Sequence, residues 1–89
     1  MARKNQICIV LTHTKGRIYT TWRYHGTVAR TKTEAKKRYS SGFYGIVDRV
    51  YTVEEVRALK LNSVEKKEIE SEIAFVYKLN RDILEDEEQ

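Results

Sequence analysis

Several features that constrain small proteins are scarce or absent in this sequence. Proline is absent, glycine occurs four times, and Cys8 is the only cysteine among 89 residues, so an intrachain disulfide is excluded. Secreted domains of this size usually depend on such disulfides. No apolar run approaches the roughly 18 residues of a membrane-spanning helix. We therefore expect a single cytoplasmic domain with no membrane partner.

Residues that could hold a metal ion or act as a nucleophile are equally scarce. Cys8, His13 and His25 are the only thiol and imidazole groups, and their spacing matches no zinc motif. Ser40 and Ser41 do not lie in the strained G-x-S-x-G turn of serine hydrolases. The sequence predicts no cofactor, no metal site and no enzymatic activity.

One enzyme class remains as a minor alternative. A small metal-independent ribonuclease could use His25, Arg23 and a tyrosine as acid, phosphate clamp and base. Small basic bacterial ribonuclease toxins resemble this chain in size and charge.

Charge is distributed unevenly along the chain. Residues 1–50 carry eleven Lys and Arg and two acidic residues, a net charge of +9. Residues 51–89 carry six basic and eleven acidic residues, a net charge of −5. Two interpretations are open: the acidic half neutralises the basic half within the fold, or the basic half forms a surface for a polyanion.

Alternating apolar residues predict a small sheet. Residues 6–14 are apolar at both odd and even positions, which is typical of a central strand. Residues 17–25 form a second strand, 27–30 a short third strand and 44–51 another. The even positions of the second strand are expected to face the core: Ile18, Thr20, Trp22 and Tyr24. For Trp22 the pattern favours burial, and an exposed anchor is the alternative.

Three helix starts share one signature, a Thr or Asn followed three residues later by Glu. The pairs are Thr31 and Glu34, Thr52 and Glu55, and Asn62 and Glu65. They predict helices over residues 32–40, 53–60 and 63–84. The acidic residues 85–89 follow a helix C-terminus, where negative charge is unfavourable, so we expect them to fray.

The order β-β-(β)-α-β-α-α predicts one α+β domain over residues 1–89. A mostly antiparallel sheet of three to four strands would carry a basic surface helix and a long C-terminal helix packed on the sheet. The apolar stripe of the long helix also has heptad-like spacing, which makes a homodimer the alternative to packing on the sheet. The stripe residues are Ile69, Ile73, Val76, Asn80 and Ile83.

The strongest functional signal is a group of basic and aromatic residues on the second strand and the first helix. Its members are Lys15, Arg17, Tyr19, Arg23, His25, Lys32, Lys36, Lys37 and Arg38. Basic side chains neutralise phosphates and release counterions, and exposed aromatic rings stack on unpaired bases. We predict a non-enzymatic module that contacts nucleic acid through these residues. A merely solubilising surface is the plainer alternative.

Residues 16–42 combine strands that have a central tryptophan with a Thr-x-x-Glu-Ala helix. The pattern is carried by Trp22, Gly26, Thr31, Glu34 and Ala35. It resembles DNA-binding modules with three strands and one helix, such as the arm-binding domains of phage integrases and plant AP2 domains. The resemblance assigns no role to any single residue.

The short, lysine-rich chain with an acidic end also looks like accessory proteins of bacteriophages. Many of those bind and inhibit a host enzyme or defence complex. The alternative partner is therefore a nucleic-acid-handling protein.

Overall fold

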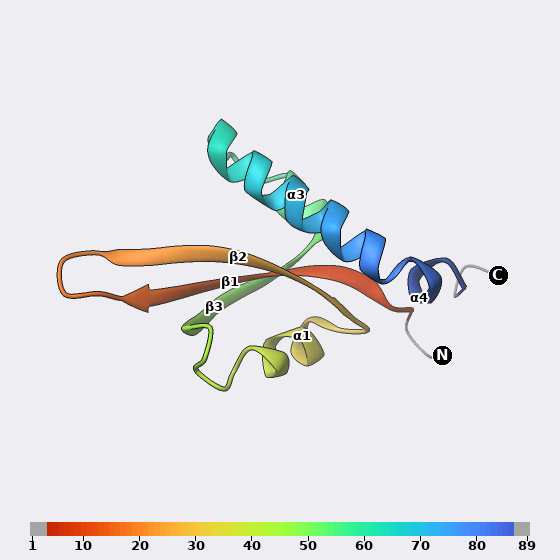
Figure 1. Ribbon diagram of the computed structural model, residues 1–89, viewed down its shortest axis with the longest axis horizontal. Coiled ribbons are helices and arrows are strands. Elements are labelled where there is room, and N and C mark those ends of the chain that lie inside the picture. The colour runs from red at the N-terminus through yellow and green to blue at the C-terminus, as the bar shows by residue number, and fades with distance from the viewer. Residues whose placement is uncertain (1–3, 87–89) are drawn as a thin grey trace.

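The computed structural model describes residues 4–86 and shows a three-stranded antiparallel sheet with helices on both faces (Figure 1). Its elements are β1 (Gln6–Lys15), β2 (Thr20–Ala29), α1 (Lys32–Arg38), β3 (Ile46–Thr52), α2 (Val53–Arg57), α3 (Ser63–Leu79) and α4 (Arg81–Asp86). The strand order is β2-β1-β3. The predicted α+β class is confirmed.

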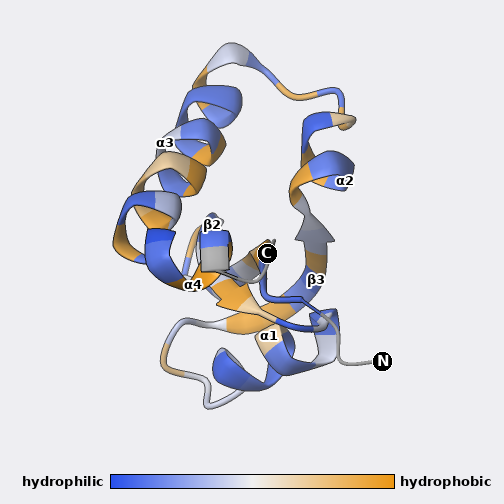
Figure 2. Ribbon diagram, turned by 90° about the vertical axis from the view of Figure 1, so that its right-hand side faces the viewer, coloured by the Kyte–Doolittle hydropathy of each residue, from blue (hydrophilic) through white to orange (hydrophobic). Residues whose placement is uncertain are grey.

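Strand β1 lies in the centre of the sheet, as its two apolar faces predicted. Cys8 and Val10 pack with Ala35 of α1 on one face, and Ile9 packs with residues of α2 and α3 on the other. All three β1 residues are fully buried. Figure 2 shows α1 on one side of the sheet and α2 and α3 on the opposite side. A central strand covered on both faces explains how so short a chain builds a core.

Helix α3 packs on the sheet through Ile69, Ile73 and Val76, which are buried. Packing on the sheet, which we preferred over a homodimer for this stripe, is therefore confirmed. The prediction of one helix over 63–84 is wrong, because α3 ends at Leu79, with Asn80 as its C-cap, and α4 begins at Arg81. The Asn80 side chain donates a hydrogen bond to the Val76 carbonyl at 2.9 Å, so it competes with the helical backbone there.

Strand β2 is continuous through Gly26, so the predicted division into a second strand over 17–25 and a third strand over 27–30 is wrong. Gly26 lies opposite Ile9 in the sheet. A β-carbon at Gly26 would lie 2.6 Å from Val76 Cγ2 of α3. The glycine therefore allows α3 to approach the sheet closely, which is a common reason for a glycine inside a strand.

Adding a methyl group at this contact should destabilise the fold. We expect Gly26→Ala to lower the free energy of unfolding by about 1–3 kcal/mol, because α3 must move or Val76 must repack. Urea denaturation followed by circular dichroism measures the loss. Combining Gly26→Ala with Val76→Ala should cost less than the sum of the single changes, since the clashing methyl is gone. Strictly additive losses would contradict this explanation.

The β1–β2 ribbon extends past the helices as a two-stranded arm, which we define as residues 13–23 (Figure 1). The pairing of β1 with β3 ends at His13 and Ile46, whereas β1 and β2 stay paired to Lys15 and Thr20. The expected burial of Ile18, Thr20 and Trp22 is therefore wrong. Ile18 is 92% exposed and Trp22 is 53% exposed, because no helix covers the arm.

Tyr24 follows the last residue of the arm and, unlike Ile18, Thr20 and Trp22, is half-buried. Its hydroxyl donates a hydrogen bond to Glu65 Oε2 at 3.2 Å, joining β2 to α3. Burial and the nearby Glu65 carboxylate raise the pKa of Tyr24 to about 12. The phenol therefore remains a neutral donor across the physiological pH range.

Helix α4 includes the first residues of the acidic end of the chain. Glu85 belongs to α4 and accepts hydrogen bonds from Tyr77 at 2.8 Å and from Arg81 Nε at 3.2 Å. The fraying expected for 85–89 stays a prediction, and residues 87–89 lie outside the described residues. Among the helices of residues 4–86, none combines the length and the apolar character needed to cross a membrane.

Candidate nucleic-acid interface

Two of the predicted binding residues are used by the fold itself. Lys32 donates to Glu55 Oε2 at 2.8 Å, and this ion pair joins α1 to α2. Arg38 Nη2 donates to Glu34 Oε1 at 3.0 Å within α1. Since both cations already have a carboxylate partner, the structure does not support them as free contacts for a ligand.

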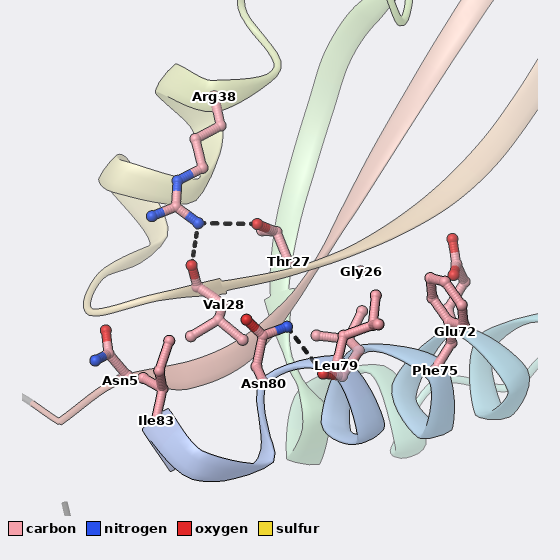
Figure 3. A pocket seen from close by; sticks show the side chains of 11 residues that line it. Asn5, Gly26, Thr27, Val28, Arg38, Glu72, Phe75, Leu79, Asn80 and Ile83 are labelled. Carbon is pink, nitrogen blue, oxygen red and sulfur yellow. Dashed lines mark hydrogen bonds between the residues drawn. The ribbon is translucent and has the colours of Figure 1, made fainter.

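Arg38 also holds α1 against the sheet (Figure 3). Its Nη1 donates to Thr27 Oγ1 at 3.0 Å and to the Val28 carbonyl of β2. These contacts form one wall of a surface pocket of about 370 Å³. Among the described lining residues Glu72 supplies the one carboxylate, and much of the wall opposite Arg38 is apolar. The part of the pocket within residues 4–86 therefore brings together no acid–base or nucleophilic set, and Arg38 is explained by packing.

The acidic half of the chain does little to neutralise the basic half. Of the five ion pairs within residues 4–86, Lys32–Glu55 alone connects residues 1–50 with residues 51–89. Residues 4–50 contain ten Lys and Arg, and two of them, Lys32 and Arg38, form ion pairs, which leaves eight without an ion pair among the described residues. Direct ion pairs to the acidic half therefore account for one of these ten cations.

Three of these unpaired cations lie on the arm, together with exposed aromatic rings. Lys15, Arg17 and Arg23 are exposed, as are the rings of Tyr19 and Trp22. The structure thus brings together the arm residues of the predicted group. It adds Trp22, which sequence reasoning had assigned to the core.

The Trp22 ring is supported from the neighbouring strands. Its centroid lies 5.0 Å from that of His13, with an angle of 41° between the ring planes. His13 Nδ1 in turn pairs with Asp48 Oδ2 of β3. This chain of contacts crosses all three strands and restricts the orientations open to the exposed ring.

A second aromatic group lies on the α1 side of the sheet. His25 stacks on Tyr39 with 5.2 Å between centroids and meets Tyr44 edge-on at 5.3 Å. Phe43 packs on Tyr44 at 5.0 Å and is 85% exposed. The aromatic residues of the loop, Phe43 and Tyr44, were not predicted as part of the site, since a loop between Gly42 and Gly45 has no periodicity to reveal them.

The α1 helix adds two cations on this side of the sheet. Lys36 and Lys37 are exposed and form no ion pair within the described residues.

His25 is an internal member of this group rather than an exposed contact. It is half-buried, and its Nε2 lies 3.0 Å from Thr12 Oγ1. Burial lowers the pKa of His25, which favours the neutral imidazole. The structure therefore gives His25 a supporting position beneath Tyr39 and Tyr44.

The described residues, 4–86, contain no group of three or more His, Cys, Asp or Glu side chains that could hold a metal ion. Cys8 is buried in the core, where burial raises the pKa of its thiol. The chain matches no protein-family model, no curated protein and no solved structure.

Proposed function

We propose that this protein is a non-enzymatic module that binds nucleic acid through its arm and the adjoining α1 face. The observation that carries the proposal is a set of cations that form no ion pair within residues 4–86 and lie near exposed aromatic rings. This set consists of Lys15, Arg17, Arg23, Lys36 and Lys37. Nucleic acid complements both kinds of side chain, since its phosphates attract the cations and its bases stack on the aromatic rings.

The number of cations sets the expected salt dependence. If all five contact phosphates, the logarithm of the binding constant should fall with the logarithm of salt concentration with a slope of about −3.5 on a single strand. Affinity should then drop about a hundred-fold between roughly 50 and 200 mM salt. Fluorescence anisotropy with labelled DNA and RNA oligonucleotides measures this slope. Absence of binding at low salt, or binding indifferent to salt, would contradict the proposal.

A protein partner is the second candidate, and Ile18 is the observation that favours it. Ile18 lies at the tip of the arm, is 92% exposed and cannot stack on a base as an aromatic ring does. Exposed apolar residues that cluster on a surface often mark protein interfaces. In this case the arm would insert into a nucleic-acid-handling enzyme or defence complex and inhibit it. Loss of such a complex in Ile18→Ala, with oligonucleotide binding unaltered, would identify this role.

A further inference from the structure

Trp22 stands out among the exposed rings because its position is fixed by the fold. It lies in regular β-structure opposite His13, not in the turn of the arm. The Trp22 ring contacts His13 of β1, and His13 in turn pairs with Asp48 of β3, so the two contacts limit the movement of the ring. A ring already held in place loses little conformational entropy when a ligand stacks on it.

The arm lacks the amide and carboxylate side chains that read adenine and cytosine edges in a duplex. In the major groove Asn and Gln pair with adenine, Glu and Asp accept from cytosine, and Arg and Lys pair with guanine. Residues 13–23 contain two arginines and one lysine but no Asn, Gln, Asp or Glu. The exposed aromatic rings of the arm find no free base face to stack on in a duplex, since its bases are stacked on each other. Unpaired bases, in contrast, offer their faces to such rings.

We infer that the ligand is single-stranded nucleic acid and that one of its bases stacks on Trp22. This inference rests on the proposed function and narrows it to one class of ligand. Lys15 lies on the same face of the arm as Trp22, because Lys15 is opposite Thr20 and Trp22 is opposite His13, whereas Arg23 lies on the other face. Lys15, together with Arg17 in the turn of the arm, can therefore contact phosphates beside the stacked base. Because every base has an aromatic face, the arm binds with little preference for sequence.

Matched oligonucleotides test the inference. The full chain is titrated against one labelled sequence as single-stranded DNA, as single-stranded RNA and as a DNA duplex, at about 50 mM salt. We expect both single strands to bind about ten-fold or more tightly than the duplex. Trp22→Ala should weaken single-strand binding by about ten-fold or more, and Trp22→Phe should retain most of the affinity because phenylalanine also stacks. Duplex binding should be the same in all variants.

The chain provides a matched control and a direct probe. Phe75 on α3 is 58% exposed, close to the 53% of Trp22, and Phe75→Ala should leave binding unchanged. Trp22 is the only tryptophan, so its fluorescence reports stacking without any substitution. We expect quenching that saturates with the single strand. This measurement decides the question even if Trp22→Ala fails to fold.

The outcomes separate the inference from the proposed function. Duplex binding as tight as single-strand binding, or wild-type affinity in Trp22→Ala, overturns the inference and leaves a nucleic-acid-binding function in place. Unquenched Trp22 fluorescence at saturation overturns it as well. If none of the three ligands binds, the proposed function fails and the inference fails with it.

Discussion

Replacing Lys15, Arg17 and Arg23 by glutamate is expected to weaken single-strand binding by about a hundred-fold or more at about 50 mM salt. All three cations lie on the arm and have no carboxylate partner within residues 4–86. Each phosphate contact on a single strand contributes about 0.7 to the salt slope, so losing three should reduce the slope by about two. Anisotropy titrations at several salt concentrations give both quantities.

A charge-matched control separates the arm from net charge. Glutamate at Lys60, Lys66 and Lys67 changes the net charge from +4 to −2, as the arm triple does, but in the acidic half of the chain. These lysines are exposed and far in sequence from the arm. We expect this control to alter binding only a few-fold, by long-range repulsion. Equal weakening by both triples would show that overall charge, and not the arm, governs binding.

Truncating the central strand should have the largest effect on stability. Ile9 is 0% exposed and packs with Val56, Ile69 and Ile73. Ile9→Ala should lower the free energy of unfolding by about 2–5 kcal/mol, since it leaves a cavity between the sheet and two helices. Because small domains have about 5–15 kcal/mol in total, the melting temperature should fall by about 10 °C or more. Calorimetry or thermal circular dichroism measures the shift.

Ile18→Ala is the matched control for Ile9→Ala, because it makes the same substitution at an exposed position. Ile18 is exposed at the tip of the arm, so the free energy of unfolding should change by no more than about 0.5 kcal/mol. A large loss in Ile18→Ala would mean that the arm packs on the domain in solution. That result would contradict the projecting arm on which the proposed function depends.

Local signals in the sequence predicted the fold well. The Thr52–Glu55 capping box forms in full, since each residue bonds the backbone N–H of the other. Gly26 shows the limit of such signals. A glycine after His25 is equally compatible with a turn and with close packing, and the deciding contact comes from Val76, fifty residues later.

The candidate site was predictable in charge but not in exposure. Strand alternation placed Arg17 and Arg23 together, and both are exposed on the arm. Burial of Trp22 depends on how far the covering helices reach, which no local pattern encodes. Arg38 is a basic residue on a surface helix, as a ligand contact would be, yet its guanidinium donates hydrogen bonds to Thr27 and Val28 of β2. A basic residue that stabilises a tertiary contact cannot be told from a binding residue by its spacing.

The arm and α4 occupy opposite ends of the long axis, which measures 50 Å (Figure 1). The arm carries three basic and no acidic residues, whereas α4 carries one basic and three acidic residues, so charge is separated along this axis as a permanent electric dipole. Near a polyanion this dipole produces a torque that turns the arm forward before contact. Productive collisions then become more frequent than a net charge of +4 alone would provide, most strongly at low ionic strength. For the nucleic-acid ligand that we propose, we therefore expect the charge division along the chain to affect the rate of encounter as well as the strength of binding.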